Sequence, residues 1–324
     1  MKNMMLSLIA LIALSASALH SQDKTDSSPH TVQFVTVDKD VKLEVLDWGG
    51  TGRPLVFLAG GGNDAHVFDK FAPKFIATYH VYGITRRGYG ASSKPAPTTA
   101  NYAADRLGDD VLAVIDALKL DRPILVGHSI AGEELSSVGS RHPEKVAGLI
   151  YLEAGYPYAY YDRSLGDVQI DQNCLQRELE QLSPLVPPKK SQVQELLQSL
   201  PQFEKDLEAI QKRLPANSDT MPVPPITPDI QIGLAAMRGE QKYTEIHVPI
   251  LAIFASPRDS GPMFKDDPSA RAAQDLYLST VVNAFQAGVP SARVVRIPNA
   301  THYIFISNEA DVLHEMNAFL ATLP

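Results

Sequence analysis

Residues 124–132 read Ile-Leu-Val-Gly-His-Ser-Ile-Ala-Gly, a short apolar run that leads directly into small residues. The apolar run is typical of a buried strand, and the small residues after it indicate a tight turn into a helix. A serine on such a strained turn holds its hydroxyl clear of the sheet, provided that the residues two before and two after it are small. Gly127 and Ala131 meet this requirement. The stretch therefore predicts a nucleophile elbow with Ser129 as the nucleophile.

Short apolar runs without alternation recur along the chain, with amphipathic stretches between them. This pattern is typical of strands buried on both faces of a mainly parallel sheet. The runs are 54–58, 80–85, 123–126, 146–152, 249–254 and 292–297. Ahead of them, residues 31–37 and 41–48 alternate apolar and polar side chains about a turn, which predicts an antiparallel hairpin. Residues 101–118 and 309–323 gather apolar side chains on one helical face, so we expect these helices to cover the sheet.

Roughly 90 residues separate the strand that ends near Leu152 from the one that starts at Pro249, far more than a usual connection. This segment begins with four tyrosines between residues 156 and 161, has a helical pattern over 192–214 and contains many prolines. We therefore expect an α/β core domain of residues 31–155 and 248–324, interrupted by a helical cap of residues 156–247.

The first residues differ from the rest of the chain. Lys2 precedes an apolar run over residues 4–14 and then the small residues of 15–18. This order is typical of a secretory signal peptide, and the run is too short for a stable membrane anchor. We expect residues 1–18 to be removed, residues 19–30 to form a flexible leader, and the mature protein to be exported to the periplasm or secreted.

Charge and cysteine content exclude several classes of function. The chain has 29 Lys and Arg against 37 Asp and Glu, a formal net charge of -8, so no basic surface is expected to bind nucleic acid. Cys174 is the single cysteine and cannot form an intramolecular disulfide. Because neither an H-E-x-x-H motif nor paired cysteines occur, we expect no metal site.

A histidine and two candidate acids follow predicted strands, and active sites of open parallel sheets lie at the carboxyl ends of their strands. His302 comes after the last strand and is the candidate general base. It follows Ser129 in the chain, in the order serine, acid, histidine that accompanies such elbows. Asp259, just after the strand that ends near Ala255, is the first candidate for the acid, and Glu153 is the alternative.

Acyl transfer also requires donors for a developing oxyanion, and backbone N–H groups of a glycine loop can supply them. The stretch Leu58-Ala59-Gly60-Gly61-Gly62-Asn63 follows a predicted strand. We expect the N–H groups of Gly61 and Ile130 to form the oxyanion hole, with Gly62 as the alternative to Gly61. A phosphate-binding loop is not indicated, because no Gly-Lys-Ser/Thr follows.

With these residues in place, the sequence resembles the α/β-hydrolase fold family, in its cap-bearing serine hydrolase branch, over nearly all of the mature chain. Residues 87–92, Arg-Gly-Tyr-Gly-Ala-Ser, are similar to the R-G-x-G-x-S segment after the fourth strand, and residues 142–146 to the H-P-E-x-V turn before the sixth. The resemblance implies a mostly parallel eight-stranded sheet with helices on both faces and an inserted cap. Members usually carry His-Gly where this chain has Ala59-Gly60, and Asp where it has Arg86.

These features predict hydrolysis of a small acyl substrate, such as a carboxylic ester, through an acyl-enzyme and without a cofactor. An amide or peptide hydrolase and an acyltransferase use the same triad and stay open as alternatives. Epoxide hydrolases and haloalkane dehalogenases share the fold and cap but attack with a carboxylate, so Ser129 argues against both. A non-catalytic ligand-binding protein on this fold is the alternative from a different class.

Overall fold

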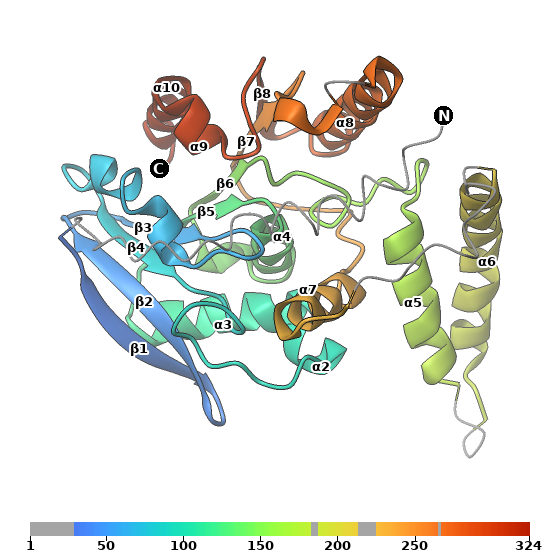
Figure 1. Cartoon of the computed structure of the whole chain (residues 1–324). Coiled ribbons are helices and arrows are strands. Elements are labelled where there is room, and N and C mark those ends of the chain that lie inside the picture. Colours follow the sequence, from blue (N-terminus) through green and yellow to red (C-terminus); the bar gives the residue numbers. More distant parts are fainter. Residues whose placement is uncertain (1–28, 183–186, 213–224, 265–266) are drawn as a thin grey trace.

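The computed structural model describes residues 29–182, 187–212, 225–264 and 267–324 (Figure 1). The predicted signal peptide, residues 1–18, and most of the predicted leader lie outside these ranges. In the described chain one sheet has the order β1-β2-β4-β3-β5-β6-β7-β8. Its strands are β1 (Thr31–Asp38), β2 (Val41–Gly49), β3 (Pro54–Leu58), β4 (His80–Ile84), β5 (Ile124–His128), β6 (Gly148–Leu152), β7 (Ile250–Ala255) and β8 (Ala292–Ile297).

The direction of the strands confirms the expected α/β-hydrolase sheet. The β1–β2 and β2–β4 pairs are antiparallel, and all the other neighbouring strands are parallel. Every residue of β5, β6 and β7 is buried, because helices cover both faces of a parallel sheet. The unalternating apolar runs of the sequence are therefore the central strands.

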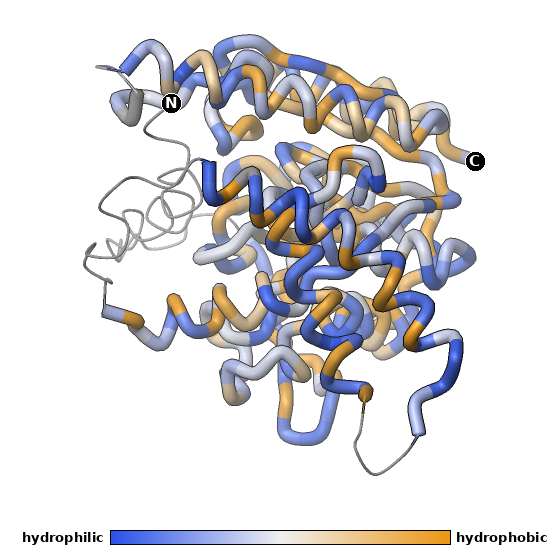
Figure 2. The backbone as a smooth tube through the Cα atoms, turned by 90° about the vertical axis from the view of Figure 1, so that its right-hand side faces the viewer, coloured by the Kyte–Doolittle hydropathy of each residue, from blue (hydrophilic) through white to orange (hydrophobic). Residues whose placement is uncertain are grey.

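Side chains of the strands alternate between two hydrophobic clusters, one on each face of the sheet. Val56 packs with α3 (Ala104–Ala117), α4 (Ala131–Arg141) and α8 (Pro268–Gly288), whereas Phe57 packs with the opposite cluster. That second face is covered by the 3₁₀ turns η1 (Ala65–Phe68) and η2 (Ala72–Phe75) and by α9 (Ile304–Ser307) and α10 (Glu309–Leu320). Figure 2 shows hydrophilic and hydrophobic residues alternating along the outer helices, as expected of helices with one buried face.

The helix predicted over residues 101–118 is observed as two helices, α2 (Thr99–Tyr102) and α3. Ala103 between them is extended, with φ −60° and ψ 145°. A methyl group on Gly239 would lie 2.4 Å from the Cα of Ala103, and the Gly239 carbonyl accepts a hydrogen bond of 3.1 Å from Ala104 N. The helix is broken because the chain after α7 (Pro228–Arg238) packs against this point, a tertiary contact that periodicity does not reveal.

Residues 156–247, which we call the inserted segment, leave the sheet after β6 and return to it at β7. They contain α5 (Val168–Glu180), α6 (Lys190–Gln211) and α7. In Figure 1, α5 and α6 lie side by side away from the sheet, whereas α7 lies close to α2 and α3. Tyr243 ties this segment to α3, because its hydroxyl donates to Asp105 Oδ1 at 2.6 Å. No helix in the described ranges is both long enough and apolar enough to cross a membrane.

Candidate active site

The turn at Ser129 has the strain that the sequence predicts. Ser129 has a φ of +55°, in the left-handed region, and lies between the end of β5 and the start of α4. The Ala131 side chain fits at this position and is fully buried. The residue that must be glycine is Gly132, because a methyl group there would lie 2.0 Å from the carbonyl oxygen of Ala154. The elbow therefore tolerates Ala131 where the motif usually has glycine.

His302 lies beside the serine. Its Nε2 is 2.9 Å from Ser129 Oγ, although the two residues are 173 positions apart in the chain. The loop between β8 and α9 carries His302, and the Ala300 carbonyl in this loop accepts a hydrogen bond of 2.8 Å from Asp259 N. This geometry allows the imidazole to accept the proton of the serine hydroxyl.

The carboxylate that contacts the other nitrogen of His302 is Glu153, at the end of β6. Glu153 Oε2 is 3.3 Å from His302 Nδ1, and its side chain is fully buried. Glu153 also has a positive φ, +51°. Burial acts to raise the pKa of Glu153, but the charge of Arg258 and the hydrogen bond with His302 outweigh burial and lower it. Glu153 is therefore a carboxylate at neutral pH, suited to orient the imidazole and balance its positive charge.

Besides His302, three donors surround the Glu153 carboxylate. Glu153 Oε1 accepts a hydrogen bond of 2.5 Å from Ala255 N, and Oε2 accepts one of 2.9 Å from the Tyr156 hydroxyl. The guanidinium of Arg258 forms an ion pair with Oε2 and also contacts the Tyr156 hydroxyl. The sequence does not identify Tyr156 or Arg258 as parts of the site, since a tyrosine and an arginine near strand ends are unremarkable in a single chain.

The first candidate for the acid, Asp259, does not contact His302, and this expectation is corrected in favour of the alternative. Asp259 is exposed, and its Oδ1 accepts a hydrogen bond of 2.8 Å from Gly261 N. After β7 the chain turns so that Arg258 enters the interior against Glu153 while Asp259 faces outward. The structure thus brings together Ser129, His302 and Glu153, and leaves Asp259 outside the cluster.

The glycine loop after β3 packs directly against the elbow. A methyl group on Gly60 would lie 3.0 Å from Ser129 Cβ, and one on Gly61 would lie 3.6 Å from a methyl of Ile130. The carbonyls of Gly60 and Gly61 accept hydrogen bonds of 3.2 Å from Asn63, from its N and its Nδ2 respectively. Because a trans peptide opposes its N–H to its C=O, the Gly61 N–H points away from Asn63.

Tyr89 lies near the loop that carries the two predicted donors. Burial raises the pKa of the Tyr89 hydroxyl, and a hydrogen bond from the backbone of Gly62 opposes that rise. The backbone of Gly62 thus lies close to the Tyr89 hydroxyl. Among the described residues, no carbonyl in a turn or loop accepts a hydrogen bond from the N–H of Gly61 or from that of Ile130. Gly61 and Ile130 therefore stay the predicted pair of oxyanion donors, with Gly62 as the alternative to Gly61.

His128 forms a hydrogen bond with the loop that carries His302. It is buried, and burial lowers its pKa to about 3. The ring is therefore neutral, and its Nε2, 2.9 Å from the carbonyl oxygen of His302, must carry the proton. This hydrogen bond fixes the backbone of His302 relative to the strand that ends in Ser129.

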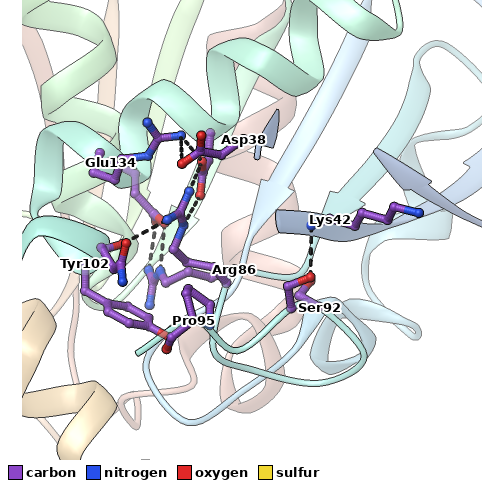
Figure 3. A network of polar contacts seen from close by, with 12 residues as sticks. Asp38, Lys42, Arg86, Ser92, Pro95, Tyr102 and Glu134 are labelled. Carbon is purple, nitrogen blue, oxygen red and sulfur yellow. Dashed lines mark hydrogen bonds and ion pairs between the residues drawn. The ribbon is translucent and has the colours of Figure 1, made fainter. Parts of the chain in front are cut away.

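A buried ion pair lies beneath the elbow and the glycine loop. Arg86 Nε and Nη2 each donate at 2.7 Å to an oxygen of Glu134, in the first turn of α4, and Nη2 lies 3.3 Å from the Ala59 carbonyl (Figure 3). Both side chains are about 5% exposed. This pairing explains why arginine can stand where relatives usually have aspartate. Among the described residues, no group of three or more His, Cys, Asp or Glu is arranged to hold a metal ion.

We expect Glu134→Gln to destabilise the protein by about 3–5 kcal/mol, because it leaves the Arg86 charge buried without its partner. Urea denaturation followed by circular dichroism measures this change. Glu144→Gln is the matched control, since the Glu144 side chain is 67% exposed. Equal midpoints for the two variants would show that Arg86 and Glu134 are not the buried pair described.

Comparison with known proteins identifies the family to which the chain belongs. Residues 53–309 match the family described as alpha/beta hydrolase fold. Fluoroacetate dehalogenase from a Burkholderia species is 33% identical over 116 residues, 35% of this chain and 38% of that protein. Epoxide hydrolase A of Mycobacterium tuberculosis is 32% identical over 114 residues, 35% of either chain. The chain thus spans about a third of the length of these two relatives.

Solved structures extend the similarity of fold to the whole chain. The crystal structure of a membrane phospholipase A, described as a bacterial virulence factor, superposes with a TM-score of 0.60 at 20% identity and covers 99% of this chain and 98% of that one. With the sheet order, the elbow and the family match, the chain belongs to the α/β-hydrolase fold family.

Proposed function

We propose that this protein is a serine hydrolase that cleaves a carboxylic ester of a small molecule through an acyl-enzyme. The observation that carries the proposal is the contact series from Ser129 Oγ to His302 Nε2 and from His302 Nδ1 to Glu153. A nucleophile, a base and an orienting acid within hydrogen-bond reach are what such catalysis requires. Ser129 occupies the position from which a carboxylate attacks in epoxide hydrolases and dehalogenases, so neither of those reactions is favoured here.

In the proposed mechanism His302 Nε2 removes the proton of Ser129 as Oγ attacks the ester carbonyl carbon. Glu153 holds His302 in the tautomer that leaves Nε2 free and balances the imidazolium. The N–H groups of Gly61 and Ile130 stabilise the oxyanion. The imidazolium then protonates the departing alcohol, and water, activated by the same histidine, releases the acid and restores the serine.

A fluorophosphonate probe tests this proposal on the wild-type protein. We expect one covalent adduct by intact mass, on the peptide that contains Ser129, and parallel loss of activity toward p-nitrophenyl acetate. Comparison with p-nitroacetanilide distinguishes an ester hydrolase from an amide hydrolase. The unlabelled mass of protein recovered after export shows whether residues 1–18 are removed. Folded protein that forms no adduct and cleaves neither compound would instead be a ligand-binding protein.

A further inference from the structure

A further buried carboxyl group lies on the helix that follows the proposed nucleophile and takes no part in the proposed triad. Glu133 is in the first turn of α4, four residues after Ser129, and is 0% exposed. Neither of its side-chain oxygens has a hydrogen-bond partner among the described residues. Its neighbour Glu134, by contrast, has both oxygens bonded to Arg86. Of these two adjacent glutamates, therefore, only Glu133 has a carboxyl group without a hydrogen-bond partner among the described residues.

An unpaired buried carboxyl group is unfavourable, and native proteins rarely keep one without a role. Burial raises the pKa of Glu133 well above its usual value. The charge of Arg86 opposes this rise, whereas the charges of Glu240, Glu134 and Asp105 add to it. The fold thus retains a carboxyl group that it neither pairs nor exposes.

The orientation of α4 shows what Glu133 faces. Ser137 lies one turn further on the same helical face, and its hydroxyl donates to Asp105 Oδ1 at 2.8 Å. Tyr243 donates to the same oxygen at 2.6 Å. This face of α4 is therefore turned toward Asp105 of α3 and the Tyr243 hydroxyl of the inserted segment. Glu240, three residues before Tyr243, is also buried, and burial raises its pKa.

The buried cations of this region are already engaged. Arg86 pairs with Glu134 and Arg258 with Glu153. Arg177 donates to the carbonyls of Arg238 and Glu240 at 3.0 and 2.9 Å. Two buried acidic groups, Glu133 and Glu240, thus lie in the region between core and inserted segment without a cation paired to either side chain in the described residues.

We propose that Glu133, with Glu240, binds a protonated amine of the substrate, so that the ester cleaved carries an ammonium group on its acyl part. Glu133 lies three residues after Ile130, the residue that precedes α4, and three residues of helix span about 4.5 Å, which places the amine a few bonds from the carbonyl that Ser129 attacks. The carboxyl group of Glu133 is closed to solvent in this structure, so binding requires the inserted segment to shift relative to α4. This inference rests on the proposed serine hydrolase activity for its catalytic consequence.

The first test compares p-nitrophenyl esters that are matched in shape and differ in charge. The pairs are 3-aminopropanoate with butanoate and 6-aminohexanoate with heptanoate. We expect the wild type to prefer the amino ester of at least one pair by about tenfold or more in kcat/KM, since a charged hydrogen bond is worth about 1.5–3 kcal/mol. Glu133→Gln should remove that preference, whereas Glu144→Gln, on the surface, should retain it. A wild type with no preference in either pair, or a Glu133→Gln variant that keeps it, overturns the proposal.

A binding measurement separates this inference from the proposed activity. In Ser129→Ala, calorimetry should show n-butylammonium binding more tightly than n-butanol, and Glu133→Gln in the same background should abolish the difference. Preferential binding of the amine without hydrolysis of any ester would support the amine site and reject the proposed activity. Equal or absent binding of both compounds rejects the amine site, whatever the hydrolysis results.

Stability shows whether Glu133→Gln remains folded. A carboxyl group with a raised folded-state pKa binds more protons in the folded state, so its contribution to stability is full below the unfolded value and is lost as pH rises. We expect the urea midpoint of the wild type to fall from pH 5 to pH 8 more than that of Glu133→Gln. The same fall in both would contradict an unpaired buried Glu133.

Discussion

Ser129→Ala is expected to reduce kcat on a p-nitrophenyl ester by about 10⁶-fold, the scale seen when a triad serine is removed. Without Oγ there is no acyl-enzyme, and the remaining N–H donors can only assist direct attack by water. His302→Ala should lose about as much, because the serine hydroxyl at 2.9 Å from Nε2 then has no base. Initial rates under saturating ester, with circular dichroism to establish folding, measure both effects.

The double variant provides the control for this expectation. Residues that act as one unit are not additive, so Ser129→Ala with His302→Ala should be no slower than either single variant. Additive losses would mean that the two side chains act independently. Retained activity and probe labelling in Ser129→Ala would place the nucleophile elsewhere.

Glu153→Gln is expected to lower kcat by about 10⁴-fold, as replacement of the triad acid by its amide does elsewhere. The amide can present its N–H₂ to His302 Nδ1, which favours the tautomer with the proton on the nitrogen that faces Ser129. Asp259→Asn is the matched control and should change kcat by less than about threefold, because Asp259 is exposed and bonds Gly261 instead. Rates across pH 5 to 9 separate the two variants.

The loss in Glu153→Gln must be distinguished from unfolding, since the variant also leaves the buried Arg258 without its carboxylate. Retention of fluorophosphonate-reactive, folded protein at a greatly reduced rate is the expected combination. If Asp259→Asn proved the slower variant while both remained folded, the acid would be Asp259 and the loop would have to rearrange in solution.

The elements that set the sheet could be predicted because their apolar runs are buried on both faces. The run at 54–58 coincides with β3, in which Leu55 to Leu58 are buried, and the runs at 123–126 and 146–152 contribute to the fully buried β5 and β6. Ser129 could be proposed as the nucleophile because it directly follows β5, and His302 as the base because it lies in the loop after β8. The acid could not be decided, because Glu153 and Asp259 both follow strands and only the turn after β7 determines which side chain points inward.

The two glutamates at the start of α4 illustrate the same limit. In the sequence Glu133 and Glu134 are equivalent acidic residues at a helix N-terminus, where negative charge is ordinarily favourable. Successive helical side chains point about 100° apart, so Glu134 reaches Arg86 while Glu133 faces the inserted segment. The partner of neither side chain can be predicted without knowing which elements pack on each side of the helix. Arg86, the partner of Glu134, lies 48 positions away in the chain.

The inserted segment leaves from β6 and returns at β7, which are neighbouring strands with Leu149 opposite Ile250. Because these strands are parallel, the segment leaves at the carboxyl end of β6 and returns at the amino end of β7, so it also carries the crossover from one edge of the sheet to the other. Ser129 and His302 lie outside this segment, in the loops after β5 and β8, so a change within the segment would leave their strands in place. A replacement segment would therefore have to span this crossover, and it should begin after Tyr156, since that residue still bonds Glu153.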